Sequence, residues 1–195
     1  MESGKTPETR RCILEAAQRL FASHGYHGAS IRDIVQACEV SNAALYYHFG
    51  NKQNLYSEVL GEYVSAVVER LRKADTGQGT CRYRLYRVAL AYAAIILESE
   101  NVLQTLLRDM AQFDREDIAR LLPDLSSQIP AVIAAILEDG IAAGEVRAVH
   151  TLQSGMLLLG MVNAIAVPRL YTEVETILAE DTEIVIDTLF EGIGA

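Results

Sequence analysis

Helical periodicity runs through nearly the whole chain and limits its fold more than any other feature. Apolar residues recur three or four positions apart, as on one face of an α-helix, and no segment shows the two-residue alternation of a β-strand. The chain has 195 residues but only four prolines, so few positions are closed to a helix. The sequence therefore predicts an all-α protein of about nine helices, long enough to bury a sizeable core.

Four polar residues mark where the N-terminal helices begin. At such a position a side-chain oxygen can accept a hydrogen bond from an N–H group of the first turn. These candidate caps are Thr6, Ser30, Ser41 and Asn51. The helices that they predict cover residues 7–24, 30–39, 41–50 and 51–74. Gly25 is expected to end the first helix, because glycine adopts left-handed backbone without a steric penalty.

The later helices are expected beyond a loop at residues 75–79. They cover residues 81–98, 102–113, 127–143, 151–168 and 173–192. The longest apolar run, Gly155–Val167, has 13 residues, fewer than the roughly 20 that span a bilayer. The N-terminal MESGKTPETRR lacks the apolar stretch of a signal peptide. We therefore expect a cytoplasmic protein with no membrane partner.

Charge is divided unequally along the chain. The net charge is −9, which argues against a protein coated in basic side chains for nucleic acid. Residues 1–56 carry a net charge of +1, whereas residues 57–195 carry −10. An acidic bulk joined to a near-neutral end suggests that the two parts have different functions.

The second and third expected helices are short and joined by a tight turn, which describes a helix-turn-helix. Ile34, Val40 and Leu45 are spaced to meet between these helices and to fix their crossing angle. The remaining polar and aromatic residues of the third helix are then left to face outward or to pack at its edge. A helix of this width fits the major groove of DNA, where its N-terminal residues reach the base edges.

The segment that follows this pattern resembles a known family. IRDIVQACEVSNAALYYHFGNKQNLYSEVL, and above all SNAALYYHFGNKQNLY, is similar to the DNA-binding signature of the TetR family of bacterial transcriptional regulators. ILEAAQRLFASHGYHGAS resembles that family's first helix, and ILEDGIAAGEVR resembles a short segment of its C-terminal part. The resemblance implies a homodimer with a three-helix DNA-binding head at residues 1–50. It also implies a helical bundle for ligand binding and dimerisation at residues 51–195, with residues 51–74 as the connecting helix.

Two positions depart from the family pattern. Glu39 stands in the turn where the family usually has glycine, and a non-glycine residue in left-handed backbone costs roughly 1–2 kcal/mol. Val35 stands where the family usually has alanine. Neither residue belongs to the expected base-reading face.

The resemblance assigns DNA contacts by position. The expected base-edge contacts are Ser41, Asn42 and Ala43, of which Asn42 can pair with adenine and Ala43 can touch a thymine methyl group. The expected phosphate contacts are Ser30, Arg32, Tyr46, His48 and Lys52. Tyr47 is either a phosphate contact or a core ring. The basic residues Lys5, Arg10 and Arg11 either add non-specific attraction or form a solvated face.

The C-terminal part is expected to bind a partner copy and a small molecule. Small and apolar residues at the expected dimer interface are Gly155, Gly160, Ala164, Ile184 and Leu189, and the alternative is that they are internal core. The resemblance also implies a ligand pocket that suits an apolar or aromatic effector, lined by Tyr63, Tyr86, Tyr92, Leu106, Met110 and Phe113. Packing in the core is the alternative for each of these side chains.

No catalytic constellation is visible in the sequence. There is no HExxH, no glycine-rich phosphate loop and no Ser/His/Asp set, so we expect neither an enzyme nor a cofactor or metal. Cys12 and Cys38 are expected in the core, and Cys81 is either a core thiol or an exposed redox-sensitive one. The resemblance to the TetR family implies a repressor that a small molecule releases from a palindromic operator. The alternatives are an activator or a ligand-binding helical dimer with vestigial DNA contacts.

Overall fold

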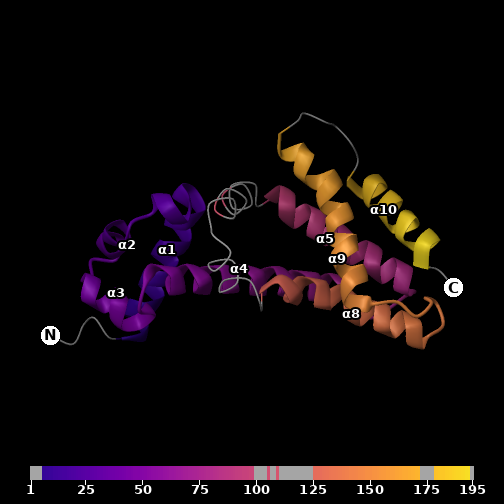
Figure 1. Ribbon diagram of the computed structural model, residues 1–195, viewed down its shortest axis with the longest axis horizontal. Coiled ribbons are helices and arrows are strands. Elements are labelled where there is room, and N and C mark those ends of the chain that lie inside the picture. The colour runs from indigo at the N-terminus through magenta and orange to yellow at the C-terminus, as the bar shows by residue number, and fades with distance from the viewer. Residues whose placement is uncertain (1–5, 99–104, 106–108, 110–124, 172–177, 194–195) are drawn as a thin grey trace. The chain divides into compact units, whose positions relative to one another are not determined.

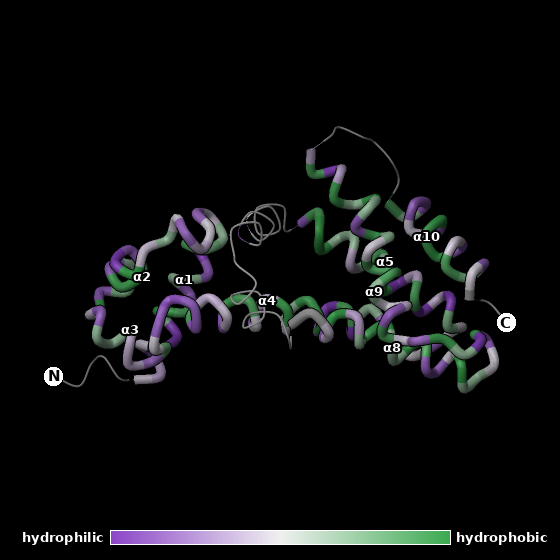
Figure 2. Tube along the Cα trace, in the orientation of Figure 1, coloured by the Kyte–Doolittle hydropathy of each residue, from purple (hydrophilic) through white to green (hydrophobic). Residues whose placement is uncertain are grey.

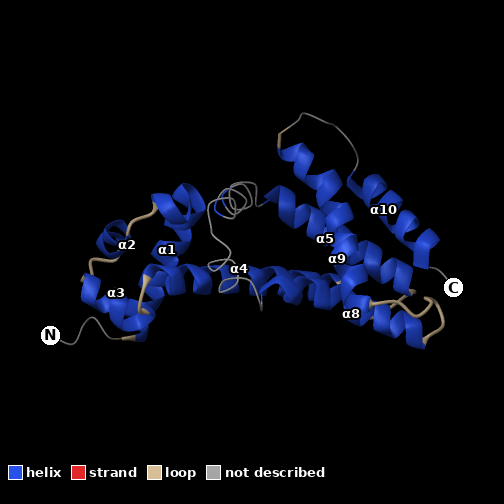
Figure 3. Cartoon of the chain, viewed as in Figure 1, coloured by secondary structure: helices blue, strands red, loops and turns tan. Residues whose placement is uncertain are grey.

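The computed structural model describes residues 6–98, 105, 109, 125–171 and 178–193, and these residues are helices joined by loops and turns with no strand (Figures 1 and 3). The all-α expectation is confirmed. The elements are α1 (Pro7–Gly28), α2 (Ile31–Ala37), α3 (Asn42–Phe49), α4 (Lys52–Ala74), α5 (Cys81–Glu98), α8 (Leu125–Ala142), α9 (Thr151–Ala166), the 3₁₀ turn η1 (Val167–Leu170) and α10 (Leu178–Ile193). The helix expected at residues 102–113 lies outside the described residues except for Thr105 and Asp109, which are both helical.

The chain divides into two compact units. The first unit is residues 1–63 with residues 101–122, and the second unit is residues 64–100 with residues 123–195. The boundary expected at residue 50 is wrong, because Leu55 and Tyr56 of α4 are buried in the same core as α1, α2 and α3. The first unit is therefore built from two separate stretches of sequence.

The four expected caps begin the first four helices. The side chains of Thr6, Ser30 and Ser41 accept hydrogen bonds from the N–H groups of Thr9, Asp33 and Ala44. The Asn51 side chain accepts one from the N–H group of Asn54 at 2.7 Å. Each bond satisfies a first-turn donor that has no partner within its own helix. These starts were visible in the sequence because a cap depends only on residues three apart.

Gly25 interrupts the helical backbone of α1, with φ 74° and ψ 177°. The regular helix therefore ends where the sequence predicted. Glu39 also has a positive φ, of 54°, in the turn between α2 and α3. The left-handed conformation expected from the family's usual glycine is present, so Glu39 carries the strain of a side chain in that region.

The second unit is a bundle in which α9 packs against α5, α8 and α10. Gly155 of α9 is buried against α8, and a Cβ atom there would lie 2.8 Å from the carbonyl oxygen of Pro130. Gly140 of α8 similarly leaves room for Cys81, since a Cβ atom there would lie 2.6 Å from its Sγ. Hydrophobic and hydrophilic residues alternate along α10 in Figure 2, as in a helix with one buried side.

A cluster of ion pairs joins the loop before α5 to helices α5 and α8 of the bundle. The guanidinium of Arg84 donates two hydrogen bonds to the carboxylate of Asp75, at 2.9 and 2.8 Å, and a third to Asp139 at 2.8 Å. The side chains of Asp75 and Arg84 are only 16% and 14% exposed. A bidentate pair with so little exposure is stronger than an ordinary surface ion pair.

One stretch among the described residues is long and apolar enough to cross a membrane, namely Thr151–Leu170 with a mean hydropathy of 1.4. A core helix of a bundle has the same length and composition. Since α9 packs against three other helices, the composition is weak evidence for a span.

Candidate nucleic-acid interface

Helix α3 exposes one face and buries the other. Ala44, Leu45 and Phe49 are buried in the core of the first unit. The exposed residues of the helix and its cap are Ser41, Asn42, Ala43, Tyr46 and Tyr47, and His48 is half-buried. Tyr47 is 60% exposed, so of its two expected roles the core ring is wrong. The residues expected at the base edges therefore lie together at the open start of the helix.

The contacts expected between α2 and α3 hold this face in position. Ile34 and Leu45 are fully buried, and Val40 in the turn packs against the same core. The two helices contact each other and both contact α1. The three residues thus fix the crossing of α2 and α3, as their spacing predicted.

Two phosphate contacts are expected at the start of α2, namely Arg32 and Ser30, and the structure places their side chains differently. Arg32 is exposed and available to a ligand on the surface. The Ser30 hydroxyl donates to the carboxylate of Asp33 at 2.6 Å and accepts from its N–H group at 3.1 Å. The bond from Ser30 lowers the pKa of the Asp33 carboxyl. Ser30 is thus engaged as the helix cap that the sequence predicted, and this engagement competes with its expected phosphate contact.

Lys52 lies at the first residue of α4, but its ammonium group is not extended into solvent. The Nζ atom lies 4.5 Å from the centre of the Tyr26 ring. Burial lowers the pKa of Lys52, and the negative charge of Asp109 acts in the opposite direction. The expected phosphate contact would require this side chain to leave the ring.

Asp109 is a buried carboxylate that sequence reasoning missed. One of its oxygens, Oδ2, accepts a hydrogen bond from the Tyr26 N–H group at 2.8 Å and another from the Tyr56 hydroxyl at 2.7 Å. Burial raises the pKa of Tyr56, and the bond to Asp109 adds to the shift. Asp109 lies 83 residues from Tyr26 in the sequence, so no local pattern could have indicated this contact.

Two basic side chains of α1 already have acidic neighbours. Arg10 pairs with Glu58 of α4 and also lies 5.1 Å from the centre of the Phe49 ring. Arg11 lies 3.7 Å from Glu15, one turn along α1. Lys5 lies outside the described residues. Arg10 and Arg11 therefore already have acidic partners within the protein.

The thiols are poorly placed for redox chemistry. Burial raises the pKa of Cys38 to about 12, and the neighbouring Cys12 adds to the shift. Both thiols are half-buried, less enclosed than expected. Cys81 is only 3% exposed, and burial raises its pKa to about 11. The alternative of an exposed Cys81 is wrong, because α8 covers the start of α5 and the Cys81 Sγ donates to the carbonyl oxygen of Ile136.

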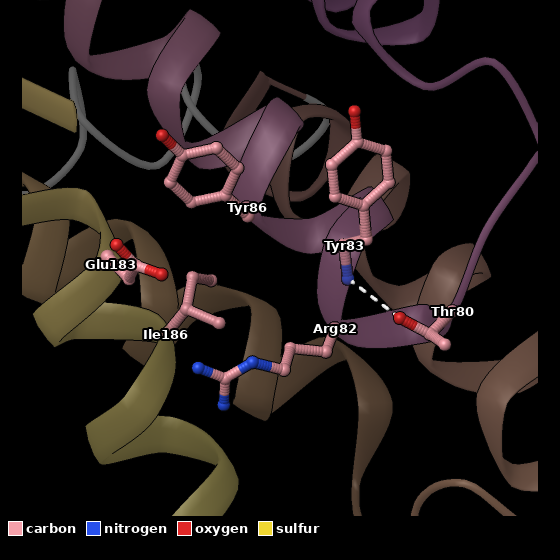
Figure 4. A pocket seen from close by; sticks show the side chains of 6 residues that line it. All are labelled: Thr80, Arg82, Tyr83, Tyr86, Glu183 and Ile186. Atoms are coloured by element: carbon pink, nitrogen blue, oxygen red, sulfur yellow. Dashed lines mark hydrogen bonds between the residues drawn. The ribbon is translucent and has the colours of Figure 1, made fainter. Parts of the chain in front are cut away.

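A hollow of about 390 Å³ opens between α5 and α10 in the second unit, and Tyr86 lines it. Figure 4 shows Tyr83 and Tyr86 of α5 beside Glu183 and Ile186 of α10. Thr80 and Arg82 complete the lining. Sequence reasoning missed Thr80, Arg82, Glu183 and Ile186 as lining residues, because the hollow exists only where α10 packs on α5.

Two of the other expected pocket residues, Tyr63 and Tyr92, do not line this hollow. The Tyr92 hydroxyl donates to the Asn163 side chain at 3.3 Å, and Tyr63 is half-buried in the first unit. Leu106, Met110 and Phe113 lie outside the described residues.

The expected dimer residues divide into an exposed and a buried set. Gly160, Ala164 and Ile184 are exposed, and Ile184 is 62% accessible. Gly155 and Leu189 are buried inside the protomer, so their assignment to the interface is wrong. Gly155 faces α8, and Leu189 faces the interior of the bundle. The open α9 surface instead includes Leu152, Met156 and Leu157.

The helix-turn-helix of α2 and α3, its exposed face and the separate helical bundle define a class: a transcriptional regulator with an N-terminal DNA-binding unit. Residues 13–59 match the model of the bacterial regulatory proteins of the tetR family. Residues 78–167 match the tetracyclin repressor-like C-terminal domain. The chain belongs to the tetR family.

One relative supports the family by sequence identity, and two solved structures support it by similarity of fold. The chain is 40% identical over 65 residues to the transcriptional repressor AcnR of Corynebacterium glutamicum, a match that covers 33% of this chain and 35% of that repressor. A putative TetR-family regulator from Mesorhizobium loti has a similar fold, with a TM-score of 0.78, 18% identity and coverage of 98% of this chain and 100% of that one. The regulator FadR of Bacillus subtilis, solved in complex with stearoyl-CoA, has a TM-score of 0.76 and 18% identity, with coverage of 94% and 98%.

Proposed function

We propose that the protein is a dimeric, cytoplasmic repressor that binds a palindromic operator through α3 and is released by a small apolar or aromatic molecule. The observation that carries the proposal is the open start of α3. Asn42 and Ala43 are exposed there on a helix whose other face is buried in the core. The similarity to AcnR, a repressor, over 65 residues supports the sign of regulation.

The proposed DNA contacts follow from the exposed positions. Asn42 would pair with adenine, and Ala43 would touch a thymine methyl group. Tyr46, Tyr47, His48 and Arg32 would bind phosphates and fix the register of α3 in the groove. Lys52 would bind a phosphate after its ammonium group leaves the Tyr26 ring. Because the first 56 residues carry a net charge of only +1, we expect a shallow dependence of affinity on salt concentration.

The proposed dimer forms through an exposed stripe on α9. Leu152, Met156, Gly160 and Ala164 follow one another at intervals of four residues, and all four are exposed. Leu157 beside them is 65% exposed, and Ile184 adds an apolar side chain from α10, which packs on α9. The small residues would allow a partner helix to approach closely, and the apolar ones would be buried by it.

The effector is proposed to bind in the second unit, with Tyr86 and the hollow between α5 and α10 as the described candidate. The similarly folded B. subtilis FadR was solved with stearoyl-CoA, a molecule with a long apolar chain, which favours an effector of apolar character. The chosen probes are a long-chain acyl-CoA thioester and free coenzyme A, which lacks the apolar chain. Release of the operator by the thioester alone is the result expected.

The deciding experiment is the selection of random double-stranded DNA by the purified protein, followed by sequencing of the retained fraction. A dimer should enrich a palindrome whose half-sites lie about one helical turn apart, roughly 34–36 Å. The absence of any enriched sequence at low salt would contradict the proposal and favour a ligand-binding dimer with vestigial DNA contacts.

A further inference from the structure

We infer that Asp109 is a positioning residue for operator binding: its carboxylate holds α1 and the start of α4 in the arrangement that fixes the orientation of α3. The inference rests on the proposed function, since it assigns a residue to the same DNA-binding activity. Asp109 is remote from the exposed face of α3 in sequence and is 2% exposed, so it acts through its neighbours and not on DNA.

The hydrogen bonds of Asp109 join two helices of the first unit. Its Oδ2 accepts from the Tyr26 N–H group at the end of α1 and from the Tyr56 hydroxyl in the second turn of α4. Tyr56 is itself only 2% exposed. Withdrawing the carboxylate would leave the Tyr56 hydroxyl without this acceptor inside the core, which is unfavourable for any buried donor.

The backbone of α1 is shaped to admit this carboxylate. A Cβ atom at Gly25 would lie 2.7 Å from the Oδ1 atom of Asp109, so only glycine leaves the space. Thr105, four residues before Asp109 in the sequence, donates its hydroxyl to the carbonyl oxygen of Ala22 at 3.1 Å. Two side chains of the same segment thus bind the last turn of α1 at two points, one as a donor and one as an acceptor.

Aromatic side chains and one lysine connect the surroundings of Asp109 to the end of α3. Tyr26 and Tyr56 lie 5.0 Å apart between ring centres, and the Lys52 ammonium group lies over the Tyr26 ring. Lys52 is the first residue of α4, and only Gly50 and Asn51 separate it from the end of α3. What fixes the start of α4 therefore also fixes the end of the recognition helix.

Half-site spacing provides a test that loss of stability alone would not affect. In a dimer, the separation of the two α3 helices determines which spacing of half-sites is bound. The selected operator is compared with two derivatives whose half-sites lie one base pair closer and one base pair farther apart. Affinities are measured at 25 °C for the wild type and for Asp109→Ala, Asp109→Asn and Tyr56→Phe.

The wild type should prefer the selected spacing. Asp109→Ala should lose about tenfold in affinity for that operator and bind all three spacings about equally. Asp109→Asn should keep the preference, because its amide oxygen can accept both hydrogen bonds. Tyr56→Phe, which removes one hydroxyl and keeps the ring, should fall between them. Asp75→Ala is the matched control, since it removes a carboxylate that pairs within the second unit and should keep the preferred spacing.

The inference is overturned if folded Asp109→Ala keeps the wild-type spacing preference. If that variant does not fold, the same result with Tyr56→Phe overturns it. A wild type that selects no operator would instead contradict the proposed function. In that case amide hydrogen exchange decides the role of Asp109: Tyr56→Phe should speed exchange in α3 and the start of α4, and unchanged exchange there overturns the inference.

Discussion

Glu39 occupies a backbone conformation that favours glycine. Its φ of 54° lies in the left-handed region, where an L-residue's Cβ atom crowds the following carbonyl oxygen. The turn between α2 and α3 imposes this conformation, because Ile34 on one side and Leu45 on the other are both fully buried. The strain is therefore maintained by the packing of the helix-turn-helix.

Replacing Glu39 by glycine should stabilise the protein. Glycine removes the steric penalty but gains freedom in the unfolded chain, so we expect a net gain of about 1 kcal/mol, or about 2–4 °C in Tm. Thermal unfolding followed by circular dichroism measures this. Glu39→Ala is the control, since alanine has the same Cβ atom and should gain nothing. Equal stabilisation by both variants would show that the side chain, and not the backbone, is the cause.

Asp75 should make stability depend on pH in the acid range. Arg84 lowers the pKa of its carboxyl in the folded state, so the folded protein binds a proton there less readily than the unfolded chain. The stabilisation is present above the unfolded pKa of about 3.9 and is lost as pH falls through the lower, folded pKa. We expect Asp75→Asn to lower the free energy of unfolding by about 2 kcal/mol at pH 7. Below the folded pKa of Asp75, the substitution should leave the free energy of unfolding unchanged. Urea unfolding at several pH values measures the difference.

The matched control for this experiment is Glu69→Gln. Glu69 also pairs with a basic residue, Lys73, but both side chains are exposed on α4. Screening by solvent makes such a pair contribute little. A difference for Asp75→Asn that stayed constant with pH would contradict the ionic explanation.

At the scale of single elements, the starts of the helices were the most predictable feature. Caps, the end of α1 at Gly25 and the buried face of α3 all depend on residues within one or two turns of each other. Which face of α9 would be buried was not predictable in the same way. Gly155 and Gly160 look alike in sequence, yet Gly155 meets the Pro130 carbonyl oxygen while Gly160 is open. That difference depends on where α8 packs.

Recognition by α3 should separate into base reading and phosphate binding. We expect Asn42→Ala to cost about 1–3 kcal/mol on the selected operator and to relax preference at one base position. Lys52→Ala should weaken binding to all sequences about equally and reduce the salt dependence by about one phosphate contact. Selection with each variant, and titrations at several salt concentrations, measure both effects. A uniform loss of affinity in both variants would refute the assignment of Asn42 to a base.

At the scale of the whole molecule, the boundary between the units was the least predictable feature. The family resemblance places it at residue 50. The structure instead includes residues 101–122 in the first unit, through contacts such as that of Asp109 with Tyr26. The hollow beside Tyr86 depends on α10 in the same non-local way. Patterns within a helix do not specify which distant helix will cover it.

Dimerisation through α9 should be sensitive to a single buried charge. Leu157→Glu would place a carboxylate in the proposed interface, and we expect the dimer dissociation constant to rise at least about a hundredfold. Sedimentation equilibrium without DNA measures this. Tyr47→Glu is the control, since Tyr47 is similarly exposed but lies in the first unit. An unchanged dimer in Leu157→Glu would move the interface to another surface.

The two-stretch construction of the first unit bears on how such a regulator acquires a new operator. A recombination that exchanged residues 1–63 alone would separate Tyr26 and Tyr56 from Asp109, because their shared acceptor is encoded far downstream. The hydrogen-bond donors of the incoming segment would have been selected to fit an acceptor in a different protein. Substitutions confined to Asn42 and its exposed neighbours leave that contact intact. Divergence of DNA specificity in this lineage is therefore expected to proceed by point mutation of the α3 surface more readily than by exchange of the N-terminal segment.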